Sequence, residues 1–214
     1  MSETSDSLIA SLVDDLTPVR PLRPADGLGR VALAAAATGA VILGLRGLAD
    51  KLAQGEVSVI FLVANGLLLL LGIAACASTI AMASPRVGNR HDGPRWAMIM
   101  AAVFPLATLF LLANHRANWP HLLDAAGGWH CFAEATLASL LVAGVLLHWL
   151  RRGAPASPRQ AGLHLGVGAT ALGSAIYGVS CANDTIAHLG VWHALPVVLG
   201  GLAGRFLVAR LLDW

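Results

Sequence analysis

The chain has 214 residues, of which 57% are hydrophobic and only 12% are charged, and its net charge is +2 at neutral pH. A soluble domain averages about 25% charged residues, so most of the surface of so apolar a chain must face lipid rather than water. The Lys and Arg residues are separated by long apolar runs and form no dense basic patch, which argues against direct nucleic-acid binding.

The N-terminal segment, residues 1–27, precedes the first apolar run. It opens with acidic rather than basic side chains, unlike a secretory signal peptide, so we expect it to remain attached and to stay in the cytoplasm. Residues 6–16 are predicted to form a short amphipathic helix, because apolar side chains recur there at helical spacing. These apolar side chains are Leu8, Ile9, Leu12, Val13 and Leu16.

A helix this short is marginal in water, so its apolar face is expected to dock onto a partner protein, the protein's own cytoplasmic loops or the membrane surface. Helices that lie on membranes usually carry Lys or Arg, whereas this one carries Asp14 and Asp15, which favours a groove in a partner protein. Three prolines in residues 18–24 then predict an extended strap. The strap is either a spacer that anchors the topology or, through Val19 and Leu22, an extension of the binding surface.

Six apolar runs predict an all-α, polytopic membrane protein, because each run is close to the roughly 20 residues that a helix needs to cross a bilayer. No period-two alternation is present, which argues against a β-barrel. The expected spans are residues 28–48, 57–83, 95–113, 129–150, 160–180 and 186–211. The chain therefore divides into a cytoplasmic segment, residues 1–27, and a transmembrane domain, residues 28–214.

The basic residues indicate the orientation of these spans. Eleven of the 14 Lys and Arg residues fall on the side that holds both termini, and three fall on the other side. The positive-inside rule therefore predicts that both termini are cytoplasmic. Small residues at every fourth position of the fifth span predict close helix packing within the chain, with a homodimer seam as the alternative.

Two of the three cysteines are expected at the outer surface, since Cys131 opens the fourth span and Cys181 closes the fifth. Cys76 lies among alanines in the second span and is interpreted as a small buried apolar side chain. Thiolates and imidazoles are ligands for zinc, cadmium and related ions, and two periplasmic thiols can also pair. The pair is thus a reversible redox or metal sensor, a permanent structural bridge, or two unrelated buried thiols.

Further ionisable side chains surround the two outer cysteines. Glu134 lies inside an expected span, where burying an acid costs free energy. We therefore expect that Glu134 either has a functional or polar-network role or simply lies at the membrane interface. Asp184 and His188 are four residues apart and are predicted to share a helical face. The candidates for additional metal ligands or for their supporting shell are His130, Glu134, Asp184, His188 and His193.

The chain resembles the NrsF family of membrane-bound anti-sigma factors along nearly its whole length. The residues that carry the resemblance are Leu8-Ile9, Leu12, Asp15-Leu16, Pro18-Val19-Arg20 and Leu22, then Arg151-Arg152-Gly153-Ala154-Pro155, and finally Cys181, Asp184 and Trp192-His193. Their order along six apolar runs is the specific feature. Ala182 stands where family members often have proline, and His188 where they more often have an apolar residue.

The resemblance implies a bacterial inner-membrane anti-sigma factor for an extracytoplasmic-function sigma factor, and no enzymatic activity. It implies that Cys131 and Cys181 form a sensor pair, with no obligate cofactor but with transient binding of a heavy-metal ion. The sigma factor would be held by Leu8, Ile9, Leu12, Val13, Asp15, Leu16, Pro18, Val19, Arg20 and Leu22.

Two other function classes are weaker on the sequence. A membrane thiol oxidoreductase would need a closely spaced reactive pair such as Cys-x-x-Cys. A small transporter would need paired charges or broken helices near the middle of the bilayer. Neither feature is evident in the sequence.

Overall fold

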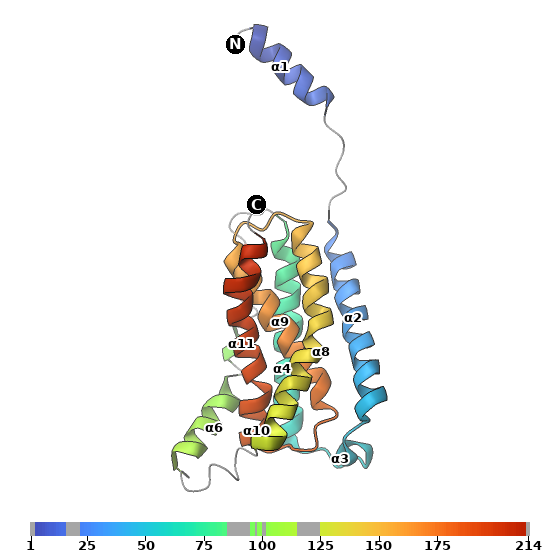
Figure 1. The fold of residues 1–214 in the computed structure, drawn as a ribbon, viewed down its shortest axis with the longest axis vertical. Coiled ribbons are helices and arrows are strands. Elements are labelled where there is room, and N and C mark those ends of the chain that lie inside the picture. Colours follow the sequence, from blue (N-terminus) through green and yellow to red (C-terminus); the bar gives the residue numbers. More distant parts are fainter. Residues whose placement is uncertain are drawn as a thin grey trace.

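The computed structural model describes residues 3–15, 22–84, 95–96, 98–99, 102–114 and 125–212, and every regular element in these ranges is a helix. The all-α fold class is therefore confirmed. The long helices lie side by side in an elongated bundle, and α1 (Glu3–Asp14) stands beyond the end of the bundle at which α2 begins (Figure 1).

The long helices are α2 (Pro24–Arg46), α4 (Val59–Met82), α8 (Ala125–Arg151) and α9 (Pro158–Gly178). Two short helices are α3 (Asp50–Ala53) and α6 (Val103–Asn114). The last helical run comprises α10 (Ile186–His188), the π-helical segment η2 (Leu189–His193), α11 (Leu195–Ala203), a second π-helical segment η3 (Gly204–Val208) and the 3₁₀ turn η4 (Ala209–Leu211).

Local sequence signals set several helix ends. Pro24 and Pro158 open α2 and α9, where the missing backbone N–H of proline would have had no partner in the helix. The hydroxyl of Ser58 caps α4 by accepting a 3.1 Å hydrogen bond from the N–H of Phe61. Gly47 ends α2 with φ of +75°, which glycine adopts without steric cost, and turns the chain toward α3.

Among the residues that the structure describes, four helical stretches are long and apolar enough to cross a membrane, namely Pro24–Arg46, Val59–Met82, Gly127–Arg151 and Ile186–Leu211. They correspond to the first, second, fourth and sixth expected spans. Large apolar side chains point outward from them, as lipid contact requires, and Leu33 and Val59 are both more than 70% exposed. The chain therefore has the helices of a membrane protein.

The other two expected spans differ from these four. The fifth is present as α9, which has 21 residues but is not among the four strongly apolar stretches. Of the third, 12 residues form α6, and several of its earlier residues lie outside the described part of the chain. The number of six spans therefore stays a prediction.

The central helix of the bundle is α9, which packs against α4, α8 and α11. Its glycines allow the backbones to come close. A Cβ atom added to Gly166 would lie 1.9 Å from the carbonyl oxygen of Gly200, and one added to Gly162 would lie 2.1 Å from that of Gly204. The small-residue face of α9 is thus used for packing within this chain, as predicted. Because neighbouring helices separate α9 from the surroundings, it can carry small and polar residues that would be unfavourable against lipid.

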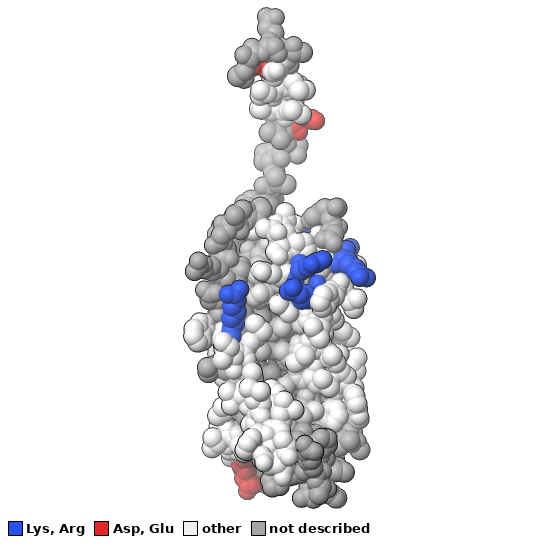
Figure 2. Space-filling view, turned by 90° about the vertical axis from the view of Figure 1, so that its left-hand side faces the viewer, with Lys and Arg blue, Asp and Glu red and all other residues white. Residues whose placement is uncertain are grey.

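Basic residues gather at one end of the bundle. On the face of the bundle drawn in Figure 2, the visible Lys and Arg side chains lie toward the end nearer α1, acidic atoms lie at the opposite end of the bundle, and further acidic atoms lie on α1 itself. The described arginines that belong to helix ends on the α1 side are Arg23, Arg30, Arg151, Arg152, Arg159, Arg205 and Arg210. Arg46 and Lys51 belong to the opposite end, where α2 runs into α3.

Candidate functional site

Cys131 and Cys181 lie in contact at the end of the bundle opposite α1. Cys131 is on α8, about two turns after the helix begins at Ala125, and Cys181 lies three residues after α9 ends at Gly178. Because α8 and α9 are antiparallel neighbours, the early part of one lies beside the end of the other. The Sγ atoms are 3.7 Å apart, and both side chains are free thiols and buried. Two unrelated thiols would not be expected to meet in this way.

Two histidines complete a four-residue cluster. The ligand atoms of Cys131, Cys181, His188 and His193 all lie within 4.8 Å of one another. Nε2 of His188 is 3.5 Å from Sγ of Cys181, and both histidines are almost fully buried, with exposed fractions of 1% and 0%. Two thiols and two imidazoles are a donor set that could hold a metal ion.

The π-helical segment η2 explains how His188 and His193 come together. In an α-helix, residues five apart point about 140° away from each other. A π-turn closes its hydrogen bonds between residues five apart, so the same two side chains lie on nearly the same side. The rings of His188 and His193 have their centroids 5.6 Å apart. The prediction that Asp184 and His188 share a helical face is wrong, because α10 begins only at Ile186.

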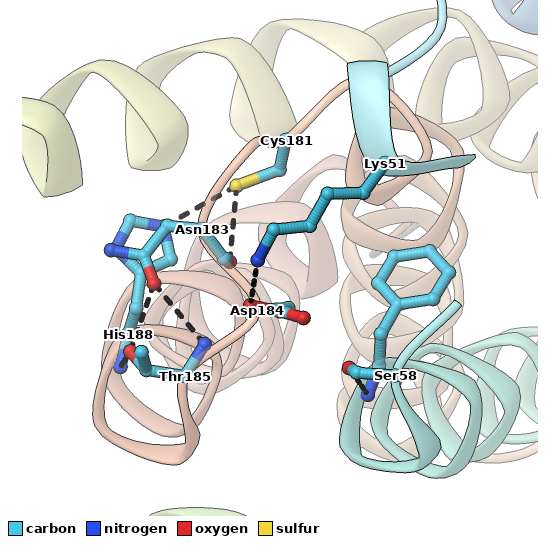
Figure 3. A network of polar contacts seen from close by, with 8 residues as sticks. Lys51, Ser58, Cys181, Asn183, Asp184, Thr185 and His188 are labelled. Atoms are coloured by element: carbon cyan, nitrogen blue, oxygen red, sulfur yellow. Dashed lines mark hydrogen bonds and ion pairs between the residues drawn. The ribbon is translucent and has the colours of Figure 1, made fainter. Parts of the chain in front are cut away.

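The loop between α9 and α10 is held by short-range polar contacts (Figure 3). The thiol of Cys181 donates to the carbonyl oxygen of Asn183 at 3.5 Å. The side-chain oxygen of Asn183 accepts hydrogen bonds from both the N–H and the hydroxyl of Thr185, and that hydroxyl caps α10 by accepting from the N–H of His188. This network fixes the position of the Cys181 loop relative to α10, the helix that carries His188.

Asp184, predicted as a candidate ligand, points to a different partner. Its carboxylate accepts a 3.0 Å hydrogen bond from Nζ of Lys51 on α3 (Figure 3). The Lys51 ammonium, followed by the hydroxyl of Ser58, holds the pKa of the Asp184 carboxyl below its ordinary value of 3.8. Asp184 therefore links the cysteine loop to α3 rather than joining the cluster.

Glu134 and His130, one turn after and one residue before Cys131 on α8, also lie outside the cluster. The Glu134 carboxylate forms an ion pair with the guanidinium of Arg46 at the end of α2, and Nε2 of His130 lies 3.9 Å from it. Glu134 is thus part of a polar network, which is one of the two roles expected for it. Among the described residues, the candidate metal group has only the two thiols and the two imidazoles as members.

Reasoning from the sequence missed Tyr177, which contacts the cluster, and also Arg46 and Lys51, which pair with the acids beside it. The hydroxyl of Tyr177 lies 3.7 Å from Sγ of Cys131, and its ring stacks near His193 with centroids 6.1 Å apart. A signal was available for Tyr177, since it is the single tyrosine and lies one helical turn before Cys181. No local signal pairs Arg46 with an acid 88 residues away.

Comparison with known families gives a direct result. A family model described as NrsF, negative regulator of sigma F, matches residues 12–214. The chain belongs to the NrsF family. The family description implies a negative regulator of a sigma factor, with a sigma factor as partner. Comparison with curated proteins and with solved structures found no match.

The expected sigma-binding segment of this NrsF protein is only partly described. Leu8, Ile9, Leu12 and Val13 on α1 are each at least half exposed, and Asp15, just after the helix, is exposed too. By contrast, Leu22 packs against the apolar core of the bundle at the end nearer α1. Leu16, Pro18, Val19 and Arg20 lie outside the described residues.

Proposed function

We propose that this NrsF protein is a six-span anti-sigma factor of the bacterial inner membrane that holds an extracytoplasmic-function sigma factor through residues 1–27. Residues 28–214 form the transmembrane sensor domain, and both termini lie in the cytoplasm. A response of Cys131 and Cys181 to metal or oxidative stress releases the sigma factor. No catalytic step is part of this proposal.

The observation that carries the proposal is the exposed apolar face of α1 in a chain whose family regulates a sigma factor. Leu8 and Leu12 are 61% and 60% exposed, while the acids Asp6 and Asp14 keep the helix unsuited to an anionic membrane surface. An apolar helical face of this kind binds a groove in a partner protein through residues three or four apart. A sigma factor is the partner that the family description supplies.

The distribution of basic residues supports a cytoplasmic location for α1. The described arginines concentrate at the bundle end nearer α1, as expected for the cytoplasmic side of a bacterial membrane. At the opposite end, Arg46 and Lys51 are neutralised by Glu134 and Asp184. Ion pairing lowers the net positive charge of the end that would face the periplasm.

The sensing step is proposed to act through helix packing. Metal binding or oxidation at Cys131 and Cys181 changes how the ends of α8 and α9 meet, and α9 contacts nearly every other long helix of the bundle. In the oxidative case, the two Sγ atoms form a disulfide and pass two electrons and two protons to an oxidant such as a peroxide. A differential affinity of about 1–3 kcal/mol between two packing states is enough for a regulatory response.

The partner interaction is tested by co-purification of the full-length chain in detergent with its sigma factor. A double change, Leu8→Glu with Leu12→Glu, is expected to abolish binding, because it places two charges on the apolar face. Ala10→Glu is the matched control, since Ala10 is exposed on the same helix but lies away from that face. Equal binding by the double variant and the control would refute the proposed role of α1.

The orientation is tested with single cysteines in a chain that lacks the native three. Labelling reagents that cannot cross the inner membrane should reach a cysteine at Gln54, which is exposed near α3, but not one at Ala10. The reverse pattern would contradict the orientation.

The sensing step is tested by a sigma-dependent reporter, in which Cys131→Ser with Cys181→Ser should remove the response to metal stress.

A further inference from the structure

We propose that Cys131, Cys181, His188 and His193 form one tetrahedral centre for a divalent ion of the zinc class, with both histidines as direct ligands. The inference rests on the proposed function only in that the same two thiols serve as the sensor. It adds two ligands, a coordination geometry and a class of metal to that site.

The distances within the cluster fit a single tetrahedral ion. Zinc bonds of about 2.3 Å to sulfur and about 2.0–2.1 Å to nitrogen give tetrahedral edges of about 3.8 Å between two sulfurs and about 3.5 Å between sulfur and nitrogen. The two Sγ atoms are 3.7 Å apart, and Sγ of Cys181 is 3.5 Å from Nε2 of His188. These two distances already match edges of a zinc-sized tetrahedron, and all four ligand atoms lie within 4.8 Å of one another.

The buried ring nitrogens of His193 also point to a ligand. Neither ring nitrogen of His193 has a hydrogen-bond partner, although the side chain is fully buried, and Nδ1 of His188 has none. A buried polar atom left without a partner costs about 1–3 kcal/mol. A metal–nitrogen bond to each ring would satisfy one nitrogen of His193 and use Nε2 of His188, which already faces the thiols.

Charge favours a divalent ion at this depth in the bundle. When M²⁺ binds, each thiol loses one proton to solvent, so two thiolates, two neutral imidazoles and the ion sum to zero charge. A neutral centre avoids the high cost of an isolated charge among apolar side chains. Two sulfur and two nitrogen donors in a tetrahedron suit zinc and its heavier relative cadmium, whereas magnesium and calcium prefer oxygen donors.

The centre would join three parts of the chain through one ion. Cys131 belongs to α8, Cys181 to the loop after α9, and the histidines to the helical run from α10 into η2. The same ion would occupy both thiolates, so a metal-bound chain cannot carry the Cys131–Cys181 disulfide at the same time. Metal binding and oxidation are therefore alternative states of one site.

The test is titration of the purified full-length chain in detergent with Cd²⁺ and, separately, with Co²⁺. One Cd²⁺ per chain should produce a thiolate-to-metal charge-transfer band, and bound Co²⁺ should give the intense visible spectrum of a tetrahedral site. Cys131→Ser and Cys181→Ser should lose the cadmium band. A weak, six-coordinate type of cobalt spectrum in the unaltered chain would overturn the proposal without depending on any variant.

The histidine variants separate a four-ligand site from a two-thiol site. His188→Ala and His193→Phe, the latter keeping a ring to stack on Tyr177, should each weaken cadmium binding about 100-fold. The control variants Cys76→Ala and His148→Ala, at a separate core position and at the far end of α8, should bind as the unaltered chain does. Unchanged affinity in both histidine variants would overturn the four-ligand centre.

Failure of this inference is distinguishable from failure of the proposed function. If cadmium binds through the thiols alone and the sigma-dependent reporter still requires them, the four-ligand centre is refuted and the anti-sigma function stands. If all four variants lose cadmium but the reporter responds normally in each of them, the centre is supported and the sensing role of the site is refuted.

Discussion

Gly128 on α8 lies directly beneath the indole ring of Trp192, and replacing this glycine by alanine should disturb the site. An added Cβ would lie 2.0 Å from Cε2 of Trp192 and 2.1 Å from its Nε1. Carbon atoms in contact are normally about 3.5–4.0 Å apart, so the ring would have to move by about 1.5 Å. Trp192 is buried and packs against Trp129, with ring centroids 5.0 Å apart, so there is little room for that movement.

The expected cost of Gly128→Ala follows from this overlap. Overpacking of a well-filled core typically costs about 1–3 kcal/mol. Alanine also favours a helix over glycine by up to about 1 kcal/mol, which partly offsets the cost. Gly144→Ala is the matched control, because Gly144 lies on the same helix and an added Cβ there would meet nothing within 4 Å. The difference between the two variants is therefore expected to be about 1–3 kcal/mol.

Thermal unfolding of both variants in detergent, followed by far-ultraviolet circular dichroism, measures this difference. At about 2–4 °C per kcal/mol for a chain of this size, Gly128→Ala should unfold roughly 2–12 °C below Gly144→Ala. Because His193 follows Trp192 directly, Gly128→Ala should also bind cadmium more weakly than the control. Equal unfolding temperatures would show that Trp192 does not pack over Gly128, and the reasoning would fail.

Three further predictions concern helix packing and the two ion pairs. Gly166→Ala should lower the unfolding temperature, because its Cβ would lie 1.9 Å from a backbone carbonyl oxygen of α11 that no rotamer change can move. Arg46→Gln should lower the free energy of unfolding by about 1–3 kcal/mol, since it leaves the largely buried carboxylate of Glu134 without its cation, and adding Glu134→Gln should restore part of the loss in a double-mutant cycle. The lowered pKa of Asp184 means that its ion pair with Lys51 stabilises the fold above pH 3.8 and that this stabilisation is lost as the pH falls through the lower folded value. Unfolding measured from pH 6 to pH 2 should therefore show a smaller decline for Lys51→Met than for the unaltered chain.

Much of the fold was predictable because hydrophobic length and helix-ending residues are local signals. The first, second, fourth and sixth expected spans correspond to strongly apolar helices, and the glycines of the fifth correctly indicated close packing. The sequence did not show that the fifth helix would be central. That position depends on how the other helices surround it, which apolar length alone does not specify.

The site was predictable only in part. Its two cysteines and two histidines were all candidates, because positions at the ends of expected spans and donor chemistry can be read from the sequence. Glu134 and Asp184 had the same apparent chemistry, but their partners Arg46 and Lys51 lie 88 and 133 residues away in the chain. The three-dimensional structure was therefore needed to distinguish the candidate metal ligands from neighbouring acids that form ion pairs.

The π-helical turn at Leu189–His193 makes the cluster depend on helix register as well as on residue identity. A π-turn corresponds to one residue inserted into an α-helix. Rewinding of this stretch into an ordinary α-helix with all its residues in place would rotate His188 by about 100° relative to His193, whereas removal of one residue such as Gly190 would leave the two histidines four residues apart on one helical face. A change from π- to α-helical winding in this stretch would thus dismantle the cluster without altering any of its four side chains.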